Sequence, residues 1–179
     1  MPAINCYCGS GKPFAICCEP YLNNTEKAST AEALMRSRYS AYCIQAVDYL
    51  VATTHSSTRK FHKKEDIMAW SRSNQWLKLE VLNATETVVE FKAYFLDERL
   101  KANIHHEQST FVNEDGNWFY VDGVFYWLLL FFIIIFIVFQ HISIAFNWKK
   151  VVVNYFHYRV NYFRSRADGI MEVADGIMR

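Results

Sequence analysis

The chain has 179 residues, of which 52% are hydrophobic and 21% are charged, and its formal net charge is +1. This length accommodates one domain with a substantial core and leaves a shorter second segment. A charge balance near zero does not favour a nucleic-acid-binding protein, so we expect no nucleic-acid partner.

The chain begins with a dense cluster of cysteines. Four of the five cysteines lie within the thirteen residues CYCGSGKPFAICC, which run from Cys6 to Cys18. A disulfide framework fits poorly, because the number of cysteines is odd and a bond between the neighbours Cys17 and Cys18 would be strained. Residues 1–4 are also too short for a signal peptide. We therefore expect reduced thiols and a cytoplasmic location.

The spacing of these cysteines is typical of a metal site. Zinc is held by four thiolates in a tetrahedron, and the CxC pair can turn toward one point if Gly9-Ser10-Gly11 folds the backbone tightly. We predict a Zn²⁺ site whose ligands are Cys6, Cys8, Cys17 and Cys18. Four thiolates leave no position for water, so the predicted metal is structural rather than catalytic.

Helices are predicted in the next part of the chain. Ser29 and Glu32 have the Ser-x-x-Glu form of a capping box, which indicates a helix start. Apolar residues then recur at intervals of three to four, up to Ala46, and a second helical piece is predicted at 48–54. A third short helix is predicted at 65–71.

After Asn74 the apolar period changes to two, which predicts strands. Leu77, Leu79 and Val81 alternate with polar residues, and a second alternating set covers 89–95. A third strand is expected at 102–113, with a hairpin turn at 114–116 leading into a fourth at 118–122. Helices followed by a strand meander predict an α+β domain whose helices pack on one face of a curved antiparallel sheet.

Several segments resemble known families. The pattern CxCxSGKxxxxCC, followed by Pro-Tyr-Leu, resembles the SEC-C zinc motif found at the C-terminus of the SecA translocase and in small bacterial proteins. The segments TAEALMRSRYSAY (30–42), DYLVATTHSSTR (48–59) and HEQSTFVNEDGNWFYVDG (106–123) resemble the YchJ family of metal-binding proteins. The resemblance covers residues 1–123. It implies a SEC-C zinc-binding motif at 1–24 and a cystatin-like cone of the nuclear transport factor type at 28–123, which we call the cone domain.

Cones of this type often hold a pocket between helix and concave sheet. His106 and Glu107 are adjacent on a predicted strand, so they point to opposite faces and cannot form one catalytic dyad, whereas His105, Glu107 and Ser109 share a face. We expect structural hydrogen bonds there more than catalysis. The polar residues that could line the pocket are Arg36, Arg38, Tyr39, His55, His106, Glu107, Ser109, Trp118, Tyr120 and Asp122.

The remainder of the chain has a different character. Residues 124–148 are almost entirely apolar, with aromatic residues at both ends, and are long enough for a transmembrane helix. Residues 149–179 form a basic tail. Positive-inside logic would place this tail in the cytoplasm and the thiols outside, which conflicts with reduced cysteines. The biased composition of 124–179 supports the hypothesis that this part arises from a frameshift or a fusion.

These features predict a zinc-binding protein that serves as a protein-interaction or adaptor module. An enzyme or small-molecule binder using the cone pocket is the alternative, as is a membrane-anchored form of either through 124–148. No nucleophile motif or phosphate loop accompanies the pocket residues, so we favour a protein that is not an enzyme.

Overall fold

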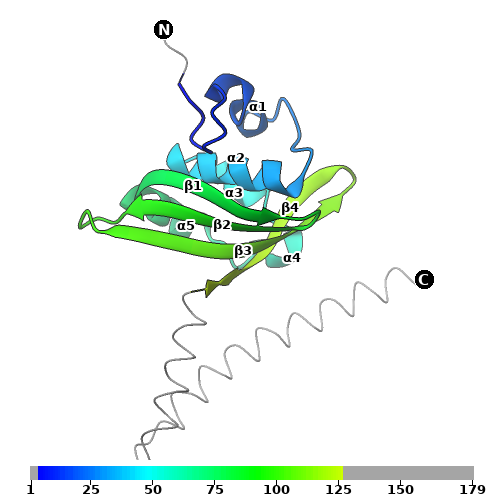
Figure 1. Cartoon of the computed structure of the whole chain (residues 1–179). Coiled ribbons are helices and arrows are strands. Elements are labelled where there is room, and N and C mark those ends of the chain that lie inside the picture. The colour runs from blue at the N-terminus through cyan, green and yellow to red at the C-terminus, as the bar shows by residue number, and fades with distance from the viewer. Residues whose placement is uncertain (1–3, 127–179) are drawn as a thin grey trace, which may run out of the picture. The chain divides into compact units, whose positions relative to one another are not determined.

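The computed structural model describes residues 4–126 (Figure 1). The helical elements precede the strands, as the sequence predicts. They are η1 (Phe14–Ile16), α1 (Glu19–Leu22), α2 (Ala31–Cys43), α3 (Val47–Ala52), α4 (Ser56–Arg59) and α5 (Lys64–Ser73). The predicted helical pieces at 48–54 and 65–71 correspond to α3 and α5, while η1, α1 and α4 were not predicted.

The start of α2 differs from the predicted capping box. Thr30, not Ser29, is the N-cap, and its side chain accepts a hydrogen bond from the backbone N–H of Ala33 at 3.0 Å. Glu32 therefore lies in the first turn and pairs with Arg36 at 2.8 Å. The capping-box prediction is wrong by one residue, because Ser29 and Thr30 both have the hydroxyl that a cap needs.

The strands form one antiparallel sheet in the order β1-β2-β3-β4. They are β1 (Gln75–Ala84), β2 (Val88–Leu96), β3 (Ala102–Glu114) and β4 (Asn117–Phe125). A register shift between Trp76 and Lys78 reverses the expected orientation at the start of β1, so Trp76 packs against the core and Leu77 is exposed. The alternation predicted for Leu79 and Val89 is confirmed, since both are buried.

The last strand runs further than predicted. Val124 and Phe125 continue β4 and pair with Gln108 and Glu107 of β3. These two residues were assigned to the apolar C-terminal segment, but here they complete the sheet. Residues 127–148 of that segment and the basic tail lie outside the described residues, and so does most of the predicted apolar helix. No helix within residues 4–126 is long and apolar enough to cross a membrane.

The core of the cone domain lies between α2 and the sheet. The α2 helix contacts β1, β2 and β4, and Figure 1 shows it lying between the sheet and the N-terminal segment. Leu34 of α2, Leu50 of α3 and Val89 of β2 are fully buried in this core. One face of α2 is thus available to the cysteine-rich segment and the other to the interior of the cone.

Candidate metal centre and central cavity

The cysteine-rich segment folds as a tight hairpin, which we call the knuckle (residues 4–24). Its two arms are joined by a bridge between Asn5 and Pro13, and the Cys6 N–H donates to the Lys12 carbonyl at 2.8 Å. Gly9 and Gly11 have φ angles of 74° and 73°. Only glycine adopts this backbone region without steric cost, so the Gly-Ser-Gly insert produces the turn between the two cysteine pairs.

The hairpin brings the four cysteine sulfurs together. All four lie within 4.8 Å of one another; Cys8 Sγ is 3.6 Å from Cys17 Sγ, which is 4.0 Å from Cys18 Sγ. Four sulfurs placed about 2.3 Å from a central ion would stand roughly 3.8 Å apart. The separations therefore fit a tetrahedral metal site and are far too long for disulfide bonds. All five cysteines are free thiols.

The four thiols are largely withdrawn from solvent, and their sulfur atoms contact one another. Cys6, Cys8 and Cys18 are buried, and Cys17 is half-buried. The pKa of Cys8 is lowered to about 4, mainly by a hydrogen bond from Cys18. The same contact raises the pKa of Cys18. Burial raises the pKa of Cys17. A metal ion must displace these protons to be bound, so acid would oppose its binding.

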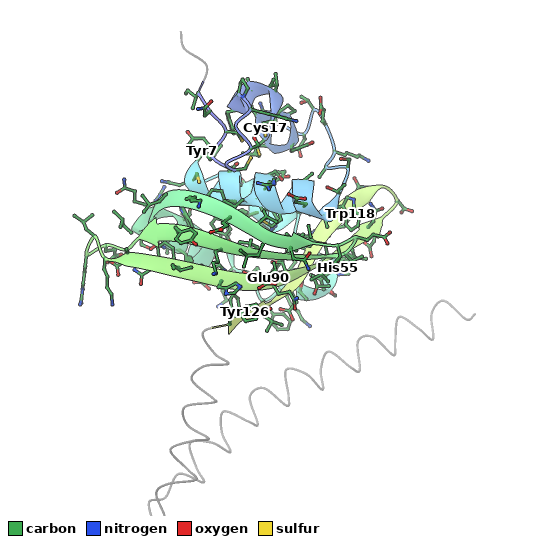
Figure 2. The ribbon with its side chains drawn as sticks, in the orientation of Figure 1. Tyr7, Cys17, His55, Glu90, Trp118 and Tyr126 are labelled. Carbon is green, nitrogen blue, oxygen red and sulfur yellow. The ribbon has the colours of Figure 1, made fainter. Side chains whose placement is uncertain are left out.

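The knuckle packs against α2. Cys6 Sγ lies 3.8 Å from Ser40 Oγ, and Arg36 donates from Nη1 to the Cys8 carbonyl at 2.9 Å. Ser10 Oγ lies 3.2 Å from Cys17 Sγ on the outer side. Figure 2 shows Cys17 in the knuckle above α2. The side chains around the sulfurs thus offer donors rather than carboxylates, which suits a cluster of thiolates.

A cavity of about 490 Å³ lies on the other side of α2, inside the cone. The lining residues come from α2, α5, the loop after α4 and all four strands. They are Met35, Arg38, Tyr39, Tyr42, His62, Trp70, Trp76, Phe91, Ala93, His105, Glu107, Ser109, Phe111, Tyr120 and Phe125. The volume is in the range of small-molecule sites.

Five of the ten predicted pocket residues, Arg38, Tyr39, Glu107, Ser109 and Tyr120, lie in this lining, and the other five lie elsewhere. Arg36 faces the knuckle, and Asp122 pairs in the sheet with Thr110. His55 caps α4 and bonds Glu114 at 2.9 Å, while Trp118 packs against the core outside the lining. His106 points away from the cavity; it bonds Glu90 at 2.8 Å and stacks on Tyr126, both labelled in Figure 2.

The polar centre of the cavity is the carboxylate of Glu107. It accepts hydrogen bonds from Ser109 (2.6 Å) and Tyr120 (3.1 Å) and pairs with His105 Nε2 at 2.6 Å. Burial alone would raise the pKa of Glu107, but the hydrogen bond and charge of His105, together with the two hydroxyls, hold it below its usual range. Glu107 is therefore a carboxylate. The face shared by His105, Glu107 and Ser109 is the one that strand alternation predicts.

The sequence profile described as "YchJ, middle NTF2-like domain" matches residues 30–123. The chain belongs to the YchJ family. The UPF0225 protein of Photorhabdus laumondii is 44% identical over 126 residues, which are 66% of this chain and 79% of that protein. A UPF0225 protein of Vibrio vulnificus is 46% identical over 129 residues, covering 69% and 76%.

Two solved structures are similar to this fold. The solution structure of a SEC-C motif containing protein from Rhodopseudomonas palustris is 38% identical and has a TM-score of 0.63, covering 68% of this chain and 98% of that chain. The crystal structure of a SEC-C motif containing protein from Psychrobacter arcticus is 30% identical, with a TM-score of 0.58 and coverages of 68% and 81%. The YchJ chain described here thus combines a four-cysteine cluster that could bind a metal ion with a nuclear-transport-factor-like domain.

Sequence reasoning did not name most of the apolar lining. Trp70 and Trp76 were not predicted to line the pocket because an inward aromatic residue looks the same in sequence whether it faces a packed core or a cavity. His105 could have been named, since it shares a strand face with Glu107.

Proposed function

We propose that Cys6, Cys8, Cys17 and Cys18 bind one Zn²⁺ and that this structural site holds the knuckle as a docking module for a protein partner in the cytoplasm. The observation that carries the metal assignment is the separation of the sulfurs, 3.6 and 4.0 Å, which brackets the spacing expected around zinc. Thiolates are soft ligands that select zinc over hard cations such as Mg²⁺ and Ca²⁺.

A structural role follows from the number of ligands. Four thiolates fill a tetrahedral ion and leave no open position at which a substrate or water could be activated. What a bound zinc would supply here is a cross-link between the CxC turn and the Cys17-Cys18 pair. Because the knuckle has little core of its own, this cross-link would account for much of its stability.

We place the surface that binds the partner on the exposed residues of the knuckle. Ile4 and Ile16 are 67% and 70% exposed, and the exposed Tyr7 packs edge-on against Phe14. Exposed aliphatic side chains on a rigid, metal-fixed loop suit the core of a small protein interface. The fold is held by other residues, so these side chains are free to contact a partner.

Zinc content tests the metal assignment. The purified full chain should contain about one zinc per chain by elemental analysis, and the double variant Cys17→Ser, Cys18→Ser should lose it. Cys43→Ser is the matched control, because Cys43 lies outside the cluster and its loss should leave zinc content unchanged. Equal zinc in the double variant and the wild type would reject the assignment.

Affinity purification tests the partner surface. A protein recovered with the tagged wild-type chain should be lost with Ile4→Ser, Ile16→Ser and retained with Leu100→Ser. Leu100 is an equally exposed apolar residue in the loop between β2 and β3. If all three chains recover the same proteins, the knuckle is not the docking surface.

A further inference from the structure

A buried cation that takes part in none of the described close ion pairs lies in the wall of the central cavity. Arg38 is only 8% exposed, and its guanidinium stands over the Tyr120 ring with 4.7 Å to the centroid. The ion pairs formed among residues 4–126 do not include Arg38. Buried charges in proteins are normally paired, so this exception calls for an explanation.

The hydrogen bonds of Arg38 are all made by one nitrogen. Nη1 donates to the Leu50 carbonyl at 2.8 Å and to Thr53 Oγ1 at 2.7 Å, with Thr54 Oγ1 at 3.4 Å. A guanidinium has five N–H groups, so three remain on Nη2 and Nε without an acceptor among the described residues. Within residues 4–126 no fully enclosed side-chain nitrogen lacks a partner, so these N–H groups reach open space, and Arg38 lines the cavity.

Glu107, the other charged group of the cavity, is already satisfied. Its two oxygens take hydrogen bonds from Ser109, Tyr120 and His105, and His105 supplies its counter-charge when protonated. A cationic ligand would therefore find a carboxylate whose acceptor positions are mostly used, and it would be repelled by Arg38. Arg38 has unused N–H donors, whereas the acceptor positions of Glu107 are mostly used, so an anion at Arg38 is favoured over a cation at Glu107.

The rest of the wall selects the shape of the ligand. The cavity is also lined by five aromatic residues, which are Tyr42, Trp70, Trp76, Phe91 and Phe125. Aromatic side chains pack best against flat, unsaturated groups, in stacked or edge-on arrangements. A cavity of about 490 Å³ accommodates a ligand the size of a bicyclic ring system with one acid group.

We propose that the cone domain of this protein binds a small planar aromatic carboxylate whose acid group pairs with the free N–H groups of Arg38. The carboxylate accepts from Nη2 and Nε, and the ring lies among the aromatic side chains of the wall. This site is separate from the knuckle, because α2 lies between them and the described hydrogen bonds of Arg38 go to Leu50, Thr53 and Thr54. Its occupation therefore does not depend on the proposed zinc site.

A series of probes that share the naphthalene ring and carry a negative, neutral or positive group tests the proposal on the unaltered full chain. In calorimetric titrations, 2-naphthoate should bind at least tenfold more tightly than the neutral 2-naphthamide, and the cationic 2-naphthylmethylamine should bind most weakly. Zinc content measured on the same sample separates this result from the metal assignment. Amide binding as tight as naphthoate, tighter binding of the amine, or no naphthoate binding at millimolar concentration would overturn the proposal.

Two arginine variants locate the site. Arg38→Met should weaken 2-naphthoate binding at least tenfold, while Arg72→Met should leave it unchanged, because Arg72 bonds Gln45 at the exposed end of α5 and is not in the cavity wall. Near-ultraviolet circular dichroism shows whether each variant is folded. Equal affinity in folded Arg38→Met and wild type would contradict the proposal. If Arg38→Met does not fold, the charge series decides alone.

Discussion

Replacing Gly123 of β4 by alanine should displace Glu107, the polar centre of the cavity on the neighbouring strand β3. Gly123 of β4 pairs with Ser109 of β3, and a Cβ atom added there would stand 2.0 Å from Glu107 Oε1, 2.5 Å from Cδ and 2.8 Å from Cγ. These distances are far below van der Waals contact. The Glu107 side chain would have to leave its position, and its hydrogen bonds to Ser109, Tyr120 and His105 would be lost or distorted.

The loss of unfolding free energy can be estimated from two effects, the overpacking and the broken charge pair. Overpacking a core position typically costs about 1–3 kcal/mol, and breaking a buried charge pair costs about 3–5 kcal/mol when one partner is left uncompensated. Partial relaxation of Glu107 should bring the total to roughly 2–4 kcal/mol of unfolding free energy. Gly116→Ala is a useful contrast. Its Cβ meets no atom within 4 Å, but its φ is 76°, so its cost should be about 1–2 kcal/mol.

Urea unfolding followed by tryptophan fluorescence measures these free energies. A double-mutant cycle makes the test specific: in a Glu107→Ala background the clashing Cγ, Cδ and Oε1 atoms are gone, so Gly123→Ala should then cost under about 1 kcal/mol. A cost below about 0.5 kcal/mol in the wild-type background would refute the reasoning. So would an undiminished cost in the Glu107→Ala background.

Three further predictions concern other parts of the domain. Thr30→Ala should lower the unfolding free energy by about 1 kcal/mol through loss of the α2 cap, whereas Ser29→Ala should have almost no effect; similar costs in urea unfolding would contradict the assigned cap. Burial, together with the charge of Arg38, lowers the pKa of His62 in the folded protein. The stability that neutral His62 contributes is therefore present above about pH 6.5 and is lost as the pH falls through the folded pKa. His62→Gln should therefore reduce the loss of stability between about pH 7 and pH 5, and an unchanged pH profile would argue against this. Chelation should increase amide exchange in residues 4–24 and leave the sheet protected; equal loss of protection in both would show that the knuckle and the cone domain unfold as one unit.

The sequence predicted the features that depend on local pattern. The change of apolar period after Asn74 predicted the sheet. The cysteine spacing predicted the cluster, because the two cysteine pairs are only nine to twelve residues apart and a short turn brings them together. The strand alternation correctly separated His106 from Glu107.

The features that escaped prediction depend on tertiary contacts. The register shift after Trp76 turns Leu77 outward, and no local signal distinguishes that shift from regular alternation. Arg36 and Arg38 are two residues apart on one helix, yet one contacts the knuckle and the other the cavity. Their separation of roughly 200° around the helix axis was available from the sequence, but which side faced the sheet was not.

X-ray absorption at the zinc edge of the purified full chain tests the proposed metal centre most directly, because it reports the number, type and distance of the ligands. Four sulfur scatterers at about 2.3 Å are predicted, with no oxygen or nitrogen ligand in the first shell. The separation of the sulfurs in the knuckle requires this result if all four cysteines bind the ion. A shell with two or fewer sulfur atoms, or a metal other than zinc in the purified protein, would contradict the assignment.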